Sequence, residues 1–469
     1  MPRGGKPSKC GRQGEFIVPA RRLSSGSTYR GQTQQYPEKM VEECVILAEA
    51  TAALVELHGI SVLERLLRTL QRCGFQRATI LSSTADVIAR KVASSPSWAR
   101  EQIDVTVRNR EPGAVTVEQI VDLWPRRAES LVVLRGDIVF DARLLRVLAA
   151  QNQSAVLIDR AAAPVLVELV ASAPEMAGAK FCGAAVVDYD WAAARSGSFE
   201  ENLRRDLATE RIAAIDVAAE PAYSREMRRD LRPFWFPAPS PYEKKLAERL
   251  LLRSAQKGAP DLPALIHAPI ENFLISRLSK SSITPNQLTF FSNVVAWTAT
   301  ILFATGRLGW GLMVALIVGV LDGLDGKQAR LKVETTKSGK LEHWFDALFE
   351  WSWWIALAYH FQRTGQLTAA FGYLSLLICA EAVAALAKWS VVRFCGRSID
   401  ELSNLTRAVR LIGGRRNIYI WILALGIVLG TPGQAFTLVA WWGAVTATVQ
   451  VPCAAFALWV RWRQSAKAS

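Results

Sequence analysis

Two hydrophobic patterns divide this chain. Up to about residue 265, apolar runs are short and separated by polar stretches, and none is long enough to cross a bilayer. After that point long apolar runs follow one another to the end of the chain. Six membrane helices are predicted, at Gln287–Gly306, Gly309–Leu321, Ala347–Phe361, Leu367–Val392, Ile418–Gly430 and Ala435–Val460. The chain is therefore expected to have a water-exposed first half and an all-α, six-helix transmembrane second half.

The first half alternates short apolar runs rich in β-formers with helical patterns such as Ser61–Arg72. This alternation predicts an α/β sheet domain with helices between its strands. The expected strands are Glu43–Ala48, Ala78–Ser82, Ile103–Val107, Leu131–Leu134, Ala155–Asp159 and Ala184–Val187.

Composition divides the chain further. Met1–Pro37 is basic and rich in Gly, Ser and Gln, with no charged-then-apolar signal peptide, so we expect a disordered tail. Arg225–Pro241 mixes basic residues with Pro, Phe and Trp, which is typical of a linker. Tyr242–Lys257 and Ala264–Lys280 are amphipathic helices that could lie in the membrane interface or pack on the first half. The expected domains are a tail (1–37), an α/β domain (38–231), a linker with interfacial helices (232–281) and a membrane domain (282–469).

The net charge of +14 comes largely from basic residues that flank the apolar runs. Anionic lipid headgroups and phosphate-bearing substrates explain this placement better than nucleic acid does. The loops on the other side carry only Arg307 and Arg363, so the positive-inside rule predicts cytoplasmic termini and a multi-pass protein of the cell (inner) membrane. The seven cysteines form no CxxC pair and are interpreted as ordinary thiols.

Four acidic residues interrupt the apolar sequence of the second half: Asp322, Asp325, Asp346 and Glu350. An unpaired carboxylate at membrane depth costs at least ~2.5 kcal/mol, so four of them predict a compensating cation. The spacings of three and four residues place each pair on one helical face. Two facing helices could then supply the oxygen ligands that Mg²⁺ or Mn²⁺ prefers.

The sequence around these acids resembles the signature of the CDP-alcohol phosphotransferase family, Asp-x-x-Asp-Gly-x-x-Ala-Arg, eight residues, Gly-x-x-x-Asp-x-x-x-Asp. The residues that match in spacing are Asp322, Asp325, Gly326, Ala329, Arg330 and Gly339. The ungapped third and fourth acidic positions hold His343 and Ala347, whereas the acids stand three residues later, nearly one helical turn on. We adopt that shifted register.

The resemblance implies a reaction and its residues. Asp322, Asp325, Asp346 and Glu350 would hold two divalent ions, and Glu350 would also be the general base. The matched residues of the first signature half and Gly339 would bind the CDP group. His343 lies on the face of the later acids and is either structural or a partner of the base. Ile283–Thr289 resembles the family's entry into its first membrane helix, with Thr284 as cap and Pro285 as first helical residue.

Other charged residues lie near the membrane runs. Arg415 and Arg416 could hold the phosphate of a donor or acceptor, or could simply anchor the fifth span. Glu381 and Lys388, seven residues apart in the fourth span, could pair inside the bundle.

The first half resembles the sugar-phosphate nucleotidyltransferase family over about Val41–Val217, through the Gly59–Phe75 stretch and Val132–Asp137. That family holds a nucleotide with a Gly-rich loop bearing Arg and Lys after its first strand. Here Glu49 and Glu56 occupy this region, and the glycines and both cations are missing. Asp137 matches the family's metal ligand, with Asp188 or Asp190 as a second one, although an Asp after a strand is more often a turn or helix cap. We expect a retained fold with lost or altered catalysis.

The combined resemblance implies an integral membrane enzyme that moves a phosphoalcohol from a CDP-linked donor to a hydroxyl acceptor and releases CMP, in phospholipid or inositol-phosphodiester synthesis. The tandem order resembles that of bifunctional inositol-phosphate cytidylyltransferase and di-myo-inositol phosphate phosphate synthase enzymes. A bifunctional enzyme that also makes its CDP-alcohol from CTP, and a non-enzymatic scaffold or transporter, remain alternatives. A homodimer is left open.

Overall fold

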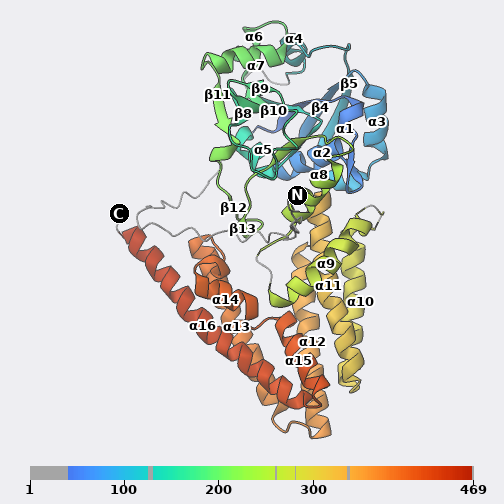
Figure 1. Cartoon of the computed structure of the whole chain (residues 1–469), viewed down its shortest axis with the longest axis vertical. Coiled ribbons are helices and arrows are strands. Elements are labelled where there is room, and N and C mark those ends of the chain that lie inside the picture. The colour runs from blue at the N-terminus through green and yellow to red at the C-terminus, as the bar shows by residue number, and fades with distance from the viewer. Residues whose placement is uncertain are drawn as a thin grey trace, which may run out of the picture.

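The computed structural model describes residues 41–124, 130–258, 261–279, 281, 283–334 and 339–466, without the side chains of 97–98, 339–346 and 401. An α/β domain lies at one end of the molecule and a helical domain at the other (Figure 1). This order confirms the predicted fold class. The tail lies outside the described residues.

A mainly parallel sheet forms the centre of the α/β domain, in the order β11-β8-β10-β6-β1-β4-β5. β6, β1, β4 and β5 are parallel neighbours, whereas β10 is antiparallel to both β6 and β8, and β11 is parallel to β8. All six predicted strands are present. The strands are β1 (Glu43–Leu47), β4 (Arg77–Ser82), β5 (Asp104–Asn109), β6 (Leu131–Arg135), β8 (Ala155–Asp159), β9 (Glu175–Met176), β10 (Ala179–Val187) and β11 (Ala213–Asp216).

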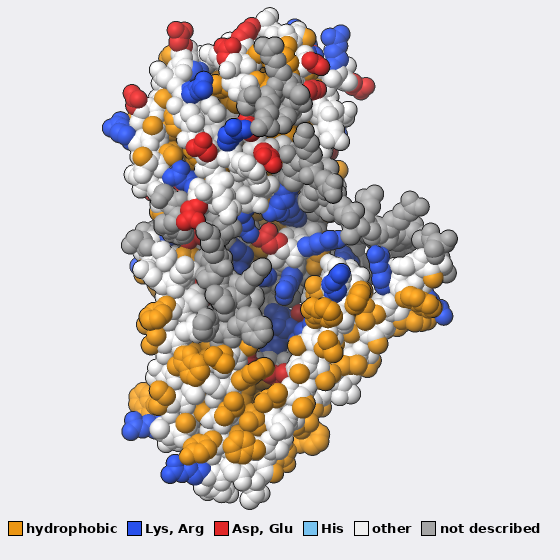
Figure 2. All heavy atoms as spheres, turned by 180° about the vertical axis from the view of Figure 1, so that it is seen from behind, with side chains coloured by type: hydrophobic (Ala, Val, Ile, Leu, Met, Phe, Trp, Pro, Cys, Tyr) orange, Lys and Arg blue, Asp and Glu red, His pale blue; other side chains and the backbone are white. Residues whose placement is uncertain are grey.

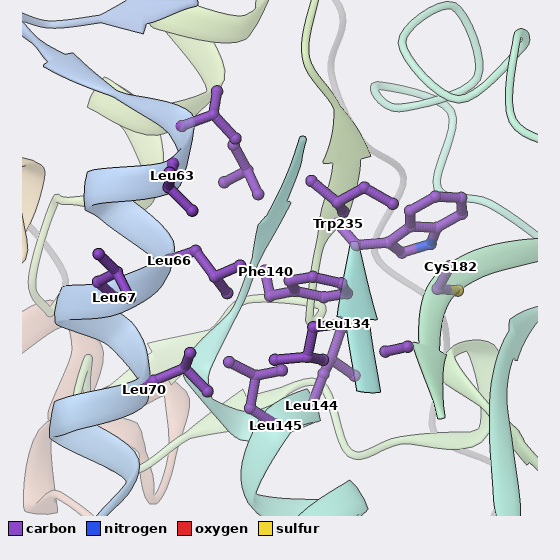
Figure 3. Packing of buried hydrophobic residues seen from close by; sticks show 14 of the residues in the cluster. Leu63, Leu66, Leu67, Leu70, Leu134, Phe140, Leu144, Leu145, Cys182 and Trp235 are labelled. Carbon is purple, nitrogen blue, oxygen red and sulfur yellow. The ribbon is translucent and has the colours of Figure 1, made fainter. Parts of the chain in front are cut away.

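Helices cover both faces of this sheet. One face is covered by α2 (Val62–Cys73) and α5 (Ala142–Ala149). In Figure 3, Leu66 of α2 extends toward Phe140. The other face is covered by α4 (Val117–Val121), α6 (Tyr189–Ala193) and α7 (Phe199–Ala208). Short helices α1 (Ala50–Ala53) and α3 (Ala85–Ser94) complete the domain.

The local sequence explains why α2 forms where it does. Ser61 caps its first turn by accepting a hydrogen bond from the Glu64 backbone N–H, and Gly74 ends it in the left-handed region with a φ of 97°. Leucines at i, i+3, i+4 and i+7 from Leu63 give one apolar face toward the sheet. The helix matches the predicted Ser61–Arg72 to within one residue.

The segment expected to be a linker contributes to the α/β domain instead. β14 (Trp235–Pro237) pairs with β7 (Ile138–Phe140), and Trp235 and Phe236 are fully buried. The Trp235 indole N–H donates to Asp159 Oδ2 over 2.9 Å. The preceding residues form the ribbon of β12 (Tyr223–Ser224) and β13 (Arg229–Asp230). Aromatic residues among basic ones therefore marked a buried strand, which extends the domain past residue 231.

The two amphipathic helices have different surroundings. α8 (Lys244–Ser254) packs on the α/β domain through Ala247 and Leu251, which supports packing rather than an interfacial position for this helix. α9 (Leu262–Leu278) packs against α11 but leaves Ile266 and Phe273 more than half exposed. An exposed apolar face beside membrane helices is consistent with contact to lipid.

The helical domain contains α10 (Pro285–Ala304), α11 (Leu308–Lys332), α12 (Gly339–Thr364), α13 (Ala370–Cys395), α14 (Asn404–Ile412), α15 (Arg416–Val428) and α16 (Pro432–Ala466). In the described part of the chain, α10, α11, α13 and α16 are long and apolar enough to span a membrane. The short α15 follows α14 with a bend of 48°, and the two together could form a fifth span. The predicted count of six spans is therefore not confirmed.

Candidate active site

The acidic motif lies at the end of α11 that faces the α/β domain (Figure 1). The helix continues unbroken through the motif and ends at Val333, which is left-handed with a φ of 53°. The Glu334 N–H closes this end by donating to the Ala329 carbonyl over 2.8 Å. The structure thus confirms that the first motif half is helical, with Asp322 and Asp325 on one face.

Asp325 is almost fully buried, with 5% of its surface exposed. Its Oδ2 accepts a hydrogen bond from the Thr289 hydroxyl on α10 over 2.8 Å. Helix α10 begins as the sequence predicts, because Thr284 is its N-cap and Pro285 its first residue. This cap fixes where α10 starts and therefore which of its residues faces the motif.

Asp322 pairs with Arg416, the first residue of α15, at 2.5 Å. The Arg416 guanidinium also lies 5.1 Å from the centre of the Phe349 ring on α12. Glu350, next along α12, is close enough to feel the charges of Arg416 and Asp322. Helices α11, α12 and α15 therefore bring two of the four predicted acids and one predicted arginine into one cluster.

The small residues of the motif are closely surrounded. A Cβ added to Gly326 would stand 3.0 Å from Nη1 of Arg330, which is tighter than ordinary contact. The Arg330 Nε donates to the Ala255 carbonyl, just after α8, over 2.6 Å. Ala329 is partly buried on the same helix. Arg330 therefore links the motif to the α/β side of the chain.

Arg415 contacts Asp400 over 3.0 Å, and Arg410 reaches the same carboxylate at 3.6 Å. Both arginines predicted to hold phosphate are thus paired with acids here. Glu381 and Lys388 lie on α13, near enough for their charges to interact.

Gly339, His343 and Asp346 belong to α12, but their side chains lie outside the described residues. Among the side chains that are described, no group of three or more His, Cys, Asp or Glu is close enough to hold a metal ion. Since Asp346 is not among them, the predicted four-residue metal set remains a prediction.

Sequence reasoning missed a buried charge pair behind the motif. Lys327 Nζ lies 3.4 Å from Glu271 Oε2 and 2.8 Å from Asn272 Oδ1, both on α9. A Cβ on Gly323 would approach the Glu271 carboxylate to 3.0 Å, so α9 packs closely on the motif helix. Glu271 is the one acid inside α9, which was the available signal.

The α/β domain holds the end of the motif helix. From α2, Arg65 Nη1 donates to the Leu331 carbonyl over 2.6 Å, and Arg68 Nη1 donates to the Lys332 carbonyl over 3.0 Å. Arg68 also pairs with Glu334 at 3.2 Å. Burial, reinforced by the charge of Arg68, lowers the pKa of Arg65 to about 9. Two buried arginines thus satisfy helix-end carbonyls that would otherwise lack partners.

The turn after β1 is occupied by the protein's own side chains. Glu49 Oε1 pairs with Arg110 over 2.5 Å, and Glu49 Oε2 accepts from the Ser83 hydroxyl over 2.6 Å. Glu56 pairs with Lys91 at 2.8 Å. Glu49 and Glu56 are therefore each paired with a basic side chain of the protein itself.

Asp137, the predicted metal ligand of this domain, forms a two-pronged ion pair with Arg135 at 2.7 and 3.0 Å. This hydrogen-bonded carboxylate raises the pKa of Arg135. Asp188 accepts from the Ser154 hydroxyl over 2.6 Å, and Asp190 lies in the first turn of α6. Asp137 and Asp188 therefore each have a partner within the protein.

Residues 282–450 match the model of the CDP-alcohol phosphatidyltransferase family. The membrane domain matches this family over most of its length. The bifunctional IPC transferase and DIPP synthase of Aquifex aeolicus (strain VF5) is 26% identical over 212 residues, which cover 44% of this chain and 47% of that protein. Its namesake from Rubrobacter xylanophilus is 28% identical over 231 residues, covering 48% of this chain and 46% of the relative. The chain spans about half the length of the curated relatives it matches.

Among solved structures, the inositol-1-phosphate CTP transferase of T. maritima covers 45% of this chain and 97% of its own length, at 11% identity and a TM-score of 0.34.

Proposed function

We propose that this protein is an integral membrane CDP-alcohol phosphotransferase that moves a phosphoalcohol from a CDP-linked donor to a hydroxyl acceptor and releases CMP. The observation that carries the proposal is that Asp322, Arg416 and Glu350 come together from three helices, with Asp325 one turn along α11 from Asp322, all within the matched family region. Phospholipid or inositol-phosphodiester synthesis is the proposed setting, and the names of the relatives support the second.

The residue types suit a hard divalent cation, but the described side chains do not form a metal site by themselves, so the proposed site also needs Asp346. Asp322 and Asp325 offer carboxylate oxygens from one face of α11, and Glu350 adds a third from α12. We assign Asp322, Asp325, Asp346 and Glu350 as ligands of two Mg²⁺ or Mn²⁺ ions. When bound, these ions would neutralise charge on the diphosphate and on the departing CMP.

The other steps of the transfer are assigned to residues of the chain. The acceptor oxygen attacks the phosphorus that carries the alcohol, the bond from this phosphorus to the CMP oxygen breaks, and the acceptor proton passes to a Glu350 carboxylate oxygen. Thr289 holds Asp325 in one orientation, so that carboxylate needs no rearrangement when the donor arrives. Gly326 and Ala329 have little or no side chain, which would let the cytidine approach the backbone of α11 closely.

We assign Arg416 a role in binding the donor, beyond anchoring the fifth span. Its contact with Asp322 and its position over Phe349 keep a positive charge beside Glu350. A donor diphosphate entering the cluster would compete with Asp322 for this guanidinium, which binds phosphate by two parallel hydrogen bonds. Arg415, engaged by Asp400, would position the start of α15.

For the α/β domain we propose a retained fold without cytidylyltransferase activity, because Glu49 with Arg110 and Asp137 with Arg135 occupy the positions that would bind nucleotide and metal. The word bifunctional in the relatives' names favours the alternative, in which this domain makes the CDP-alcohol from CTP. We further propose that the motif, both termini and the α/β domain face the cytoplasm, because the basic residues gather on that side.

The decisive experiment uses the purified full-length protein in detergent. With CMP and a phosphodiester product, it should show Mg²⁺- or Mn²⁺-dependent reverse transfer that EDTA abolishes. Asp322→Asn and Asp325→Asn should each abolish the reaction while the protein stays in the membrane fraction, and Asp86→Asn, an exposed acid on α3, is the matched control. Full activity in EDTA would contradict the metal assignment, and absence of any transfer would favour a scaffold or transporter.

A further inference from the structure

A cavity of about 990 Å³ lies between the α/β domain and the ends of α11, α13 and α16. Its upper wall comes from α2, α5, the β12–β13 ribbon and α8, and its floor from the C-terminal ends of the three membrane helices. Figure 2 shows Lys and Arg side chains gathered in the band between the α/β domain and the apolar surface of the membrane helices. None of Asp322, Asp325 and Glu350 lines this cavity.

The charge of the lining is strongly unbalanced. Eight arginines contribute to it against two acids, Asp141 and Glu226. Both acids are already neutralised, because Asp141 pairs with Arg143 and Glu226 pairs with Arg72. The lining arginines are Arg65, Arg72, Arg143, Arg146, Arg225, Arg330, Arg397 and Arg461.

Three of these arginines come from different elements. Arg225 of the ribbon reaches the end of α13, where a Cβ on Gly396 would stand 3.7 Å from its Nη2. Arg397 lies over the Tyr223 ring at 5.1 Å, and Arg461 comes from α16. Within the described ranges none of the three forms an ion pair. Guanidinium groups without acidic partners that line one recess attract anions, above all phosphate.

The floor of the cavity is apolar. Phe456, Ala457 and Val460 of α16 line it, and Phe456 is 64% exposed. Trp459 and Trp462 are exposed on the same stretch of helix, as is typical of the aromatic belt at a membrane surface. The cavity therefore offers guanidinium groups above and an apolar surface below.

We infer that this interdomain cavity is a binding site for a phosphate-bearing anion, held by Arg225, Arg397 and Arg461. The site is separate from the carboxylate cluster and does not depend on the proposed transfer reaction. Two sources share this chemistry: the headgroup of an anionic phospholipid and a soluble phosphate. The apolar floor adds affinity only for the lipid, so the two sources predict different binding.

The test measures binding to the full-length protein in detergent, using short-chain phosphatidylglycerol, the matched phosphatidylcholine and inorganic phosphate as probes. The variant is Arg225→Ala with Arg397→Ala and Arg461→Ala. All three side chains are exposed, so their truncation leaves no buried group unpaired. The control removes the same charge from exposed arginines of the α/β domain outside the cavity, as Arg108→Ala with Arg204→Ala and Arg211→Ala.

We expect phosphatidylglycerol to bind more tightly than phosphatidylcholine and to lose at least tenfold in affinity in the cavity variant, with the control unchanged. Loss of inorganic phosphate binding without a change in lipid binding would assign the site to a soluble phosphate. Equal effects of both triple variants, or no effect of the cavity variant on either anion, would overturn the inference. Arg461→Glu alone, at the exposed end of α16, gives the same readout if the triple variant is poorly folded.

Discussion

Replacing Arg68 by Ala should uncouple the α/β domain from the motif helix. Arg68 is 2% exposed and bonds Glu64 at 2.8 Å, Glu334 at 3.2 Å and the Lys332 carbonyl at 3.0 Å. Truncation leaves the buried Glu334 carboxylate without this guanidinium and a helix-end carbonyl without its donor. Removing one partner of a buried ion pair costs about 3–5 kcal/mol.

The matched control is Arg72→Ala, one turn further along α2. Arg72 pairs with Glu226, whose side chain is 47% exposed, so losing this pair should cost no more than about 1 kcal/mol. For a domain of roughly 200 residues, 1 kcal/mol shifts Tm by about 2–4 °C. Arg68→Ala should therefore melt about 6–20 °C below the wild type, and Arg72→Ala within about 4 °C.

Thermal unfolding of the detergent-purified protein, followed by tryptophan fluorescence, measures both variants. Activity should fall in parallel for Arg68→Ala alone, since the end of α11 that carries the motif loses its support. Adding Glu334→Gln to Arg68→Ala should recover part of the loss, because the unpaired buried charge is then removed. Equal melting temperatures for the Arg68 and Arg72 variants would refute the reasoning.

Three further outcomes are expected. Glu350→Gln should lower the rate of transfer about 10²-fold or more, the usual scale for a lost general base, whereas His343→Ala should cost much less; the reverse ranking in initial-rate assays would assign the base to His343. Full-length protein given CTP and inositol phosphate should release no pyrophosphate, and release that Asp137→Ala abolishes would instead make the chain bifunctional. Trp235→Ala should destabilise the α/β domain by about 3–5 kcal/mol in chemical denaturation, as expected for a core residue but not for a linker.

The sequence was most informative where local chemistry decides the structure. Strand β8 was predicted to the residue, because an apolar run bounded by polar residues has few alternatives. The start of α10 was also predicted, since Thr284 and Pro285 act through the first turn alone. The spacing of Asp322 and Asp325 placed them on one face without any tertiary information.

Tertiary contacts decided the rest. Trp235 stands among basic residues and prolines, and only its pairing partner β7 and the Asp159 acceptor show that it is buried. Likewise, Arg416 was expected to hold phosphate or anchor a span, but its partner Asp322 lies 94 positions earlier. No local pattern specifies contacts across such separations.

The α/β domain supports the membrane helices through contacts that involve no nucleotide. Arg65 and Arg68 of α2 supply the donors for the last carbonyls of α11, the helix that carries Asp322 and Asp325. Helix α2 also forms part of the wall of the arginine-lined cavity. Removing the domain would leave two helix-end carbonyls without these donors and would remove one wall of the cavity. These contacts come from buried arginines of α2, whereas Glu49 and Arg110 follow β1 and β5, so changes at Glu49 or Arg110 need not disturb the membrane site.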